Sequence, residues 1–92
     1  ANASKWRTIK GPVHVGICVW FAMPSSWNKK KRAAHAGQLY GKKPDADNVT
    51  KAVLDALTDC GAWVDDSQVA SCLVIKRWAE QGPATLIEIV EL

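Results

Sequence analysis

The segment from Val13 to Phe21 constrains the fold most, because it has the alternation of a β-strand and apolar side chains on both faces. A strand that is apolar on both faces is typical of a central position in a sheet. We therefore expect a central strand here, ended by Pro24. Its two alternating sets of side chains are Val13, Val15, Ile17, Val19 and Phe21, and His14, Gly16, Cys18 and Trp20.

The segment Asn48–Thr58 has the clearest helical pattern in the chain. Its apolar residues recur at three- and four-residue spacings, so they form one stripe along the helix. Asp47 or Asn48 is expected to cap the N-terminus, and Gly61 follows the helix as a stop signal. The stripe consists of Val49, Ala52, Val53, Ala56 and Leu57.

Two further strands are expected, from Gln68 to about Trp78 and from Thr85 to Glu91, with a turn at residues 81–83 between them. Because they are consecutive, we expect them to form an antiparallel hairpin. Together with a short helix upstream, this order predicts an α+β fold, a single small sheet of about three or more strands with a helix packed on one face. The length of 92 residues fits one domain over residues 1–92, beginning with a polar lead-in over residues 1–12.

Charge is divided unequally along the chain. Residues 1–43 contain nine Lys or Arg and no acidic residue, whereas residues 44–92 contain three basic and nine acidic residues. The basic part is concentrated in residues 23–44, where a short helix is expected from a cap at Ser25 or Ser26 to about Ala36. A polyanion would be attracted by the first half and repelled by the second, unless metal cations neutralise the aspartates. This combination favours a nucleic-acid phosphodiester as substrate.

Several classes of protein are not expected. No run of about 20 apolar residues is available to span a membrane, and we expect no secretory signal peptide because the start lacks an apolar block. The three cysteines, Cys18, Cys60 and Cys72, are odd in number and lack C-x-x-C spacing. We interpret them as reduced, mostly buried thiols, which predicts a cytoplasmic protein.

Three aspartates carry the predicted chemistry. Asp45 and Asp47 lie two residues apart just before the predicted helix, where an extended backbone would point both carboxylates the same way. The helix is roughly 16 Å long, and the residues from Thr58 to Asp66 can span about 26 Å, so Asp66 can return beside them. Three clustered carboxylates would repel one another unless a divalent cation bound them, and oxygen ligands suit Mg²⁺ or Mn²⁺.

Lys51 lies four residues after Asp47, on the same helix face, where its charge would stabilise negative charge developing on a scissile phosphate. Each feature also has a structural interpretation. Asp47 would then be a helix cap, Asp47 and Lys51 a surface pair, and Asp65 and Asp66 turn residues. We interpret Asp55 as solvent-facing or ion-paired, and prefer Asp66 over Asp65 as the third ligand.

The tryptophans have two interpretations. Trp20, Trp63 and Trp78 lie in or beside apolar segments and are expected in the core. Trp27 lies within the basic segment, where it would either pack or stack on an unpaired base. Of these two roles for Trp27 we favour packing.

At this point the residues match a known pattern. The run from Lys43 to Leu57, KPDADNVTKAVLDAL, followed by WVDDSQV at residues 63–69, closely resembles the RusA family of Holliday-junction resolvases. The resemblance extends from about Gly11 to the C-terminus. It implies a RusA-like fold and a homodimer that binds four-way junction DNA in the recombination and repair of bacteria and their phages.

The resemblance also implies roles for individual residues. Asp45, Asp47 and Asp66 resemble the family's essential acidic residues and Lys51 its essential lysine. The carboxylates would hold Mg²⁺, with Mn²⁺ as a substitute, for in-line attack of water and paired symmetric nicks that leave 5′-phosphates and 3′-hydroxyls. The residues that resemble the family's DNA-facing basic region are Lys29, Lys30, Lys31, Arg32, Lys42 and Lys43.

The sequence departs from the pattern in one respect. Typical members begin with an additional strand and helix before the strand expected at residues 13–22, and we expect most of that part to be missing here. The alternatives to a metal-dependent endonuclease are therefore a catalytically weak or inactive DNA-binding remnant of prophage origin, and an interaction module without a nucleic-acid role.

Overall fold

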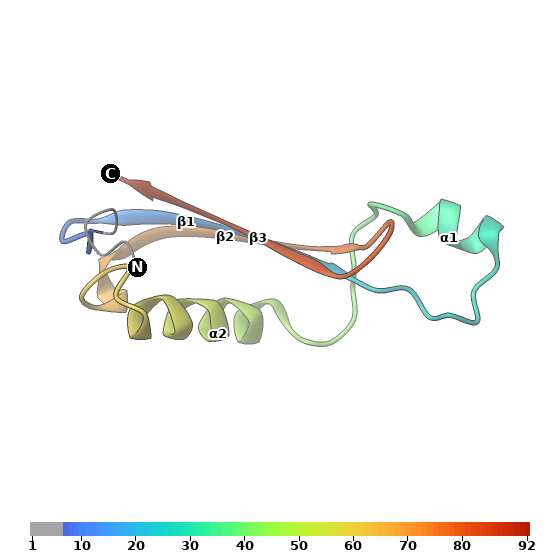
Figure 1. The fold of residues 1–92 in the computed structure, drawn as a ribbon, viewed down its shortest axis with the longest axis horizontal. Helices are drawn as coiled ribbons and strands as arrows, with labels where there is room; N and C mark the ends of the chain where they lie inside the picture. The colour runs from blue at the N-terminus through green and yellow to red at the C-terminus, as the bar shows by residue number, and fades with distance from the viewer. Residues whose placement is uncertain (1–6) are drawn as a thin grey trace.

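The computed structural model describes residues 7–92 and contains three strands, two α-helices and a short 3₁₀ helix in those residues. Figure 1 shows the strands as one layer, with α2 along one face and α1 beyond one end of the sheet. The predicted α+β class is confirmed. The elements are β1 (Val13–Phe21), α1 (Lys29–His35), α2 (Ala46–Asp59), η2 (Asp66–Gln68), β2 (Val69–Trp78) and β3 (Ala84–Glu91).

The strand order in the sheet is β2-β1-β3, so β1 is central, as predicted. It pairs in parallel with β2 and antiparallel with β3. The predicted hairpin between β2 and β3 is wrong, because β1 lies between them. The connection at residues 79–83 crosses two strand spacings, or about 10 Å, which five residues can span.

The core lies between β1 and α2. Val13, Val15 and Ile17 are buried on the α2 side of the sheet, together with Ala62 and Trp63 from the segment after α2. Residues of the predicted helical stripe, among them Val49 and Val53, pack against them. The indole N–H of Trp63 donates to the hydroxyl of Thr58 at 2.8 Å, so this buried group keeps a hydrogen-bond partner.

The beginning of the chain takes part in this core. Ile9 forms a parallel bridge with Trp63, and its amide donates to the carbonyl of Ala62 at 2.9 Å. The second half of the predicted lead-in therefore contributes to the fold, whereas residues 1–6 lie outside the described residues.

The helix boundaries differ from the predictions at their N-termini. The first helix is capped by Asn28, whose side chain accepts from the amide of Lys31, and not by Ser25 or Ser26. The second helix begins at Ala46 with Asp45 at the cap, two residues earlier than expected. Its end is as predicted, because Gly61 follows it with a φ of 87°.

The opposite face of the sheet has no helix packed on it in the described residues (Figure 1). Leu73, Leu86 and Val90 are 56, 61 and 41% exposed. Trp20 is only half-buried, whereas Trp63 and Trp78 are buried as expected.

The cysteines are all free, as predicted, but they are not mostly buried. Cys60 and Cys72 are exposed and Cys18 is half-buried. The part of the Cys72 thiol that its neighbours cover is desolvated, which raises its pKa. No helix in residues 7–92 has the length and apolar character needed to cross a bilayer.

Removing two methyl groups from the core should destabilise the fold. Val15 has no exposed surface, so Val15→Ala is expected to lower the free energy of unfolding by about 2–3 kcal/mol. The control is Val90→Ala on the open face, for which a loss of about 0.5 kcal/mol or less is expected. Denaturant unfolding measures both, and equal losses would contradict this account of the core.

Candidate active site

A groove of about 460 Å³ lies between α2 and β2. It gathers four charged side chains from two elements, namely Asp47, Lys51 and Asp55 from α2 and Asp66 from η2. Leu54 and Val74 form its apolar floor. Asp47, Lys51 and Asp66, three of the four predicted catalytic residues, are thus brought to one exposed groove.

The turn at η2 explains why Asp66 is available to this groove and Asp65 is not. Asp65 accepts from the amide of Gln68 and from the hydroxyl of Ser67. The Gln68 side chain in turn accepts from the Asp65 amide and donates to the carbonyls of Ile9 and Gly11 at 2.9 Å. This capping box occupies the Asp65 carboxylate and fixes the turn, which supports the preference for Asp66.

Asp45 and Asp47 differ in backbone conformation. Asp45 is the extended cap residue of α2, whereas Asp47 lies in its first helical turn. The expectation of parallel carboxylates rested on an extended backbone through both residues, and this premise is wrong because the backbone is already helical at Asp47. Asp45 accordingly does not line the groove with Asp47.

No three His, Cys, Asp or Glu side chains within residues 7–92 come close enough together to hold one metal ion. The predicted set of three ligands therefore stays a prediction. The donor chemistry of the groove nevertheless fits Mg²⁺, which is usually held by one or two carboxylates, substrate phosphates and water. Asp47 and Asp66 are the pair that the groove offers for this purpose.

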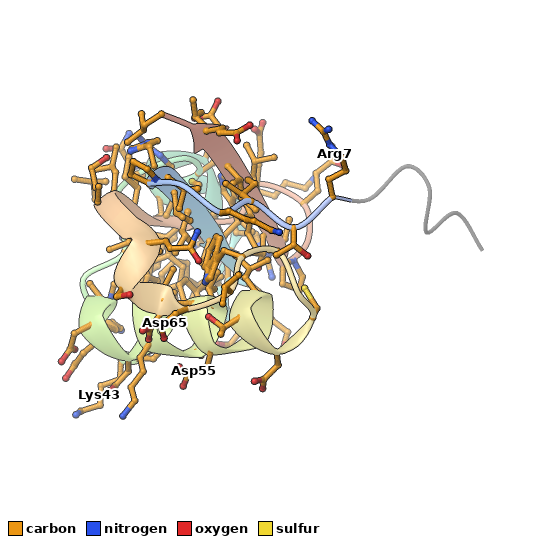
Figure 2. All side chains as sticks on the ribbon, turned by 90° about the vertical axis from the view of Figure 1, so that its left-hand side faces the viewer. Arg7, Lys43, Asp55 and Asp65 are labelled. Atoms are coloured by element: carbon orange, nitrogen blue, oxygen red, sulfur yellow. The ribbon has the colours of Figure 1, made fainter. Side chains whose placement is uncertain are left out.

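Asp55 was expected to be solvent-facing or ion-paired, and it is exposed as expected, at the border of the groove. Its side chain leaves α2 on the side away from the sheet (Figure 2). The four-residue steps from Asp47 to Lys51 and from Lys51 to Asp55 place all three on one helix face. This spacing in the sequence already indicates that Asp55 lies on the same helix face as Asp47 and Lys51.

Lys76 on β2 holds the loop that leads into α2. Its ammonium group donates to the carbonyls of Lys42 and Pro44, at 2.6 Å in each case. Tyr40 adds two contacts, since its amide donates to the carbonyl of Lys76 at 2.8 Å and its hydroxyl donates to the carbonyl of Lys43 at 2.9 Å. These bonds fix the start of the helix that carries Asp47.

Residues 22–45, here called the arm, contain the six residues predicted to face DNA. Lys29, Lys30 and Lys31 are exposed on α1, and Lys42 and Lys43 are exposed in the following loop (Figure 2 for Lys43). Arg32 differs, because it is half-buried and donates to the carbonyls of Trp27 and Pro24 at 3.2 and 3.0 Å. Five of the six cations are thus exposed and accessible to a polyanion.

Comparison with known proteins gives a consistent family. The sequence model of the family described as "Endodeoxyribonuclease RusA" matches residues 1–90. An uncharacterized protein of Bacillus subtilis strain 168, YqaN, is 42% identical over 77 residues, which cover 79% of this chain and 54% of that protein. The crossover junction endodeoxyribonucleases RusA of Escherichia coli strain K12 and of Enterobacteria phage 82 are each 39% identical over 51 residues, 55% of this chain and 42% of theirs. The chain spans about half the length of these curated relatives.

The bonds made by Lys76 give a prediction. Lys76→Met removes a charged donor from two carbonyls, and we expect it to lower the free energy of unfolding by about 1–2 kcal/mol, discounted for partial exposure. Lys43→Met, a change in the same loop at an exposed side chain, is the control and is expected to be within about 0.5 kcal/mol of wild type. Unfolding curves of equal midpoint for the two variants would contradict the role of Lys76.

Proposed function

The chain belongs to the RusA family of endodeoxyribonucleases, and from this premise we propose that it hydrolyses DNA phosphodiester bonds at four-way junctions. The observation that carries the proposal is the groove that holds Asp47, Lys51 and Asp66 together. Two carboxylates and a lysine beside one exposed depression suit a reaction at a phosphate, because they can bind a cation and neutralise developing charge.

We propose that the reaction depends on Mg²⁺, for which Mn²⁺ would substitute. When bound, the cation would supply a Lewis acid that stabilises charge on the phosphoryl oxygens. Asp47 and Asp66 would hold it from opposite elements, α2 and η2. Asp45, at the cap of α2, is the third predicted ligand and would have to turn toward the groove.

Lys51 has a role that needs no metal. It lies one helical turn after Asp47, so its ammonium group is on the groove side of α2. Negative charge increases on the phosphate as the P–O bond breaks, and a fixed cation at that point stabilises the transition state more than the ground state.

Paired symmetric nicks require two grooves, one for each cut strand. The described residues of one chain offer one groove with Asp47, Lys51 and Asp66, so two copies of the chain would be needed. A two-fold symmetric homodimer would supply them on a junction whose opposing strands are related by the same symmetry. The exposed lysines of the arm would bind the arms of the junction through their phosphates. We place this activity in DNA recombination and repair, in the cytoplasm of a bacterium.

The metal and its ligands are tested together with a labelled four-way junction and a matching duplex. We expect nicking of the junction in Mg²⁺ or Mn²⁺, none in EDTA, and a loss of about 100-fold or more in Asp47→Asn. The control Asp59→Asn removes an exposed carboxylate at the other end of α2 and should leave nicking unchanged. Junction binding without nicking in either metal would contradict the proposed activity and favour a binding remnant.

Lys51 is tested by charge removal. Lys51→Ala is expected to lower the single-turnover nicking rate by about 100- to 1,000-fold, while junction affinity measured in Ca²⁺ changes little, because the lysine acts mainly in the transition state. Lys51→Arg keeps the charge and should retain more activity than Lys51→Ala. A nicking rate equal to wild type in Lys51→Ala would exclude this role.

A further inference from the structure

The arm carries an aromatic cluster that the proposed hydrolysis does not use. The ring centroid of Trp27 lies 4.6 Å from that of His35 and 4.9 Å from that of Trp78. The ring of Tyr40 lies 4.7 Å from Trp78 and 4.1 Å from Phe21, on which it stacks. Such contacts make a rigid platform of rings at the end of the sheet.

Two lysines lie over the faces of these rings. The ammonium group of Lys31 is 4.4 Å from the centroid of Trp27, and that of Lys42 is 5.8 Å from the centroid of Trp78. Both lysines and both tryptophans line one depression of about 410 Å³, together with His35. This volume falls in the range of about 300–1,000 Å³ that is typical of small-ligand sites.

The two tryptophans differ in what they leave accessible. Trp78 is only 7% exposed, so its ring serves as support. Trp27 is half-buried, and the side chain of Lys31 lies over one face of its ring. A lysine side chain is flexible, so it can move aside and expose that face. Trp27 is therefore the ring on which a planar ligand could stack.

We propose that this depression binds one unstacked nucleotide of the DNA substrate, with its base on Trp27 and its phosphate beside Lys31 and Lys42. Every base has a π-face that can stack on an indole, and the adjacent ammonium groups match the phosphate charge. The proposal rests on the proposed function, because it assigns a recognition subsite to the same DNA substrate.

The backbone holds this platform in place. The amide of Gly37 donates to the carbonyl of Trp78 at 3.1 Å, and the amide of Trp78 donates to the carbonyl of Gln38 at 2.9 Å. Arg77 adds a bond to the carbonyl of Gly37 at 2.9 Å. The arm is thus bonded to the end of β2, so a base that stacks there pays little for ordering the protein.

The subsite is close to the groove along the chain. Lys42 and Asp47 are five positions apart in the chain, a span of at most about 18 Å. This distance corresponds to about five stacked nucleotides of one strand. Unstacking is least costly where pairing is already broken, so a subsite of this kind would favour the branch point of a junction over an intact duplex.

The test uses the junction and the matching duplex in Ca²⁺, where binding is measured by fluorescence anisotropy without nicking. Trp27→Leu keeps an apolar side chain but removes the π-face, and is expected to weaken junction binding by about 5- to 150-fold. Duplex binding should change by less than about two-fold, because phosphate contacts dominate it. Trp27→Phe should restore part of the loss.

Two controls separate stacking from support of the arm. A junction with abasic sites at the branch point should bind wild type as weakly as the intact junction binds Trp27→Leu, and the variant should lose nothing further. Lys31→Ala should weaken junction binding more than Lys30→Ala, since Lys30 is on the same helix but does not line the depression.

The outcomes are distinct. Equal loss on junction and duplex, or no loss in Trp27→Leu, would overturn the subsite and leave Trp27 a packing residue, while wild-type nicking of the junction would still support the proposed function. Wild-type protein that neither binds nor nicks a junction would overturn both. If Trp27→Leu unfolds, the comparison of Trp27→Phe with wild type on intact and abasic junctions decides.

Discussion

The parallel pairing of β1 with β2 is the constraint on which the rest of the structure depends. Parallel neighbours cannot be joined by a tight turn, because the chain must return to the end of the sheet where the first strand began. Here the return occupies residues 22–68, which contain the arm, α2 and η2. Every residue assigned a role in the proposed chemistry lies in that connection, so the groove and the cations predicted to face DNA are both products of one crossover.

The charge pattern follows the same connection. Its first part, up to Lys43, is basic and extends beyond the end of the sheet, whereas its second part carries the aspartates back along the sheet (Figure 1). Asp47 and Asp66 are exposed, so water screens the repulsion between their carboxylates. The chain therefore needs no bound cation in order to fold. The approach of a phosphate changes this balance, because its charge would add to those of the aspartates in the groove, where Lys51 is the counter-charge among the lining residues. The proposed divalent cation would therefore serve the bound substrate more than the fold.

The periodicity of apolar residues was sufficient to predict the strands and the second helix, but not which elements lie next to one another. The alternation in Val13–Phe21 and the stripe of Val49 and Val53 report which side of an element is buried, which is a local property. Which strands pair is not a local property. The predicted hairpin of β2 and β3 was wrong because each of these strands pairs with β1 instead. The premise for Asp45 and Asp47 was wrong for a similar reason, since the helix begins two residues earlier than expected and Asp47 is therefore no longer in an extended backbone. The pairing of Trp27 with Trp78 joins residues about 50 positions apart, which no spacing rule reports.

Lys76 and Trp78 connect the two parts of the proposed site. Both lie at the same end of β2, and Lys76 bonds to the loop before α2 while the backbone of Trp78 bonds to the loop after α1. A nucleotide on the arm and a phosphate in the groove would thus be positioned against one strand. Fixing two contacts to a single rigid element lowers the ordering cost of binding and holds the scissile bond at a defined distance from the branch point. The end of β2 is accordingly the element through which recognition in the arm would determine where the groove cuts.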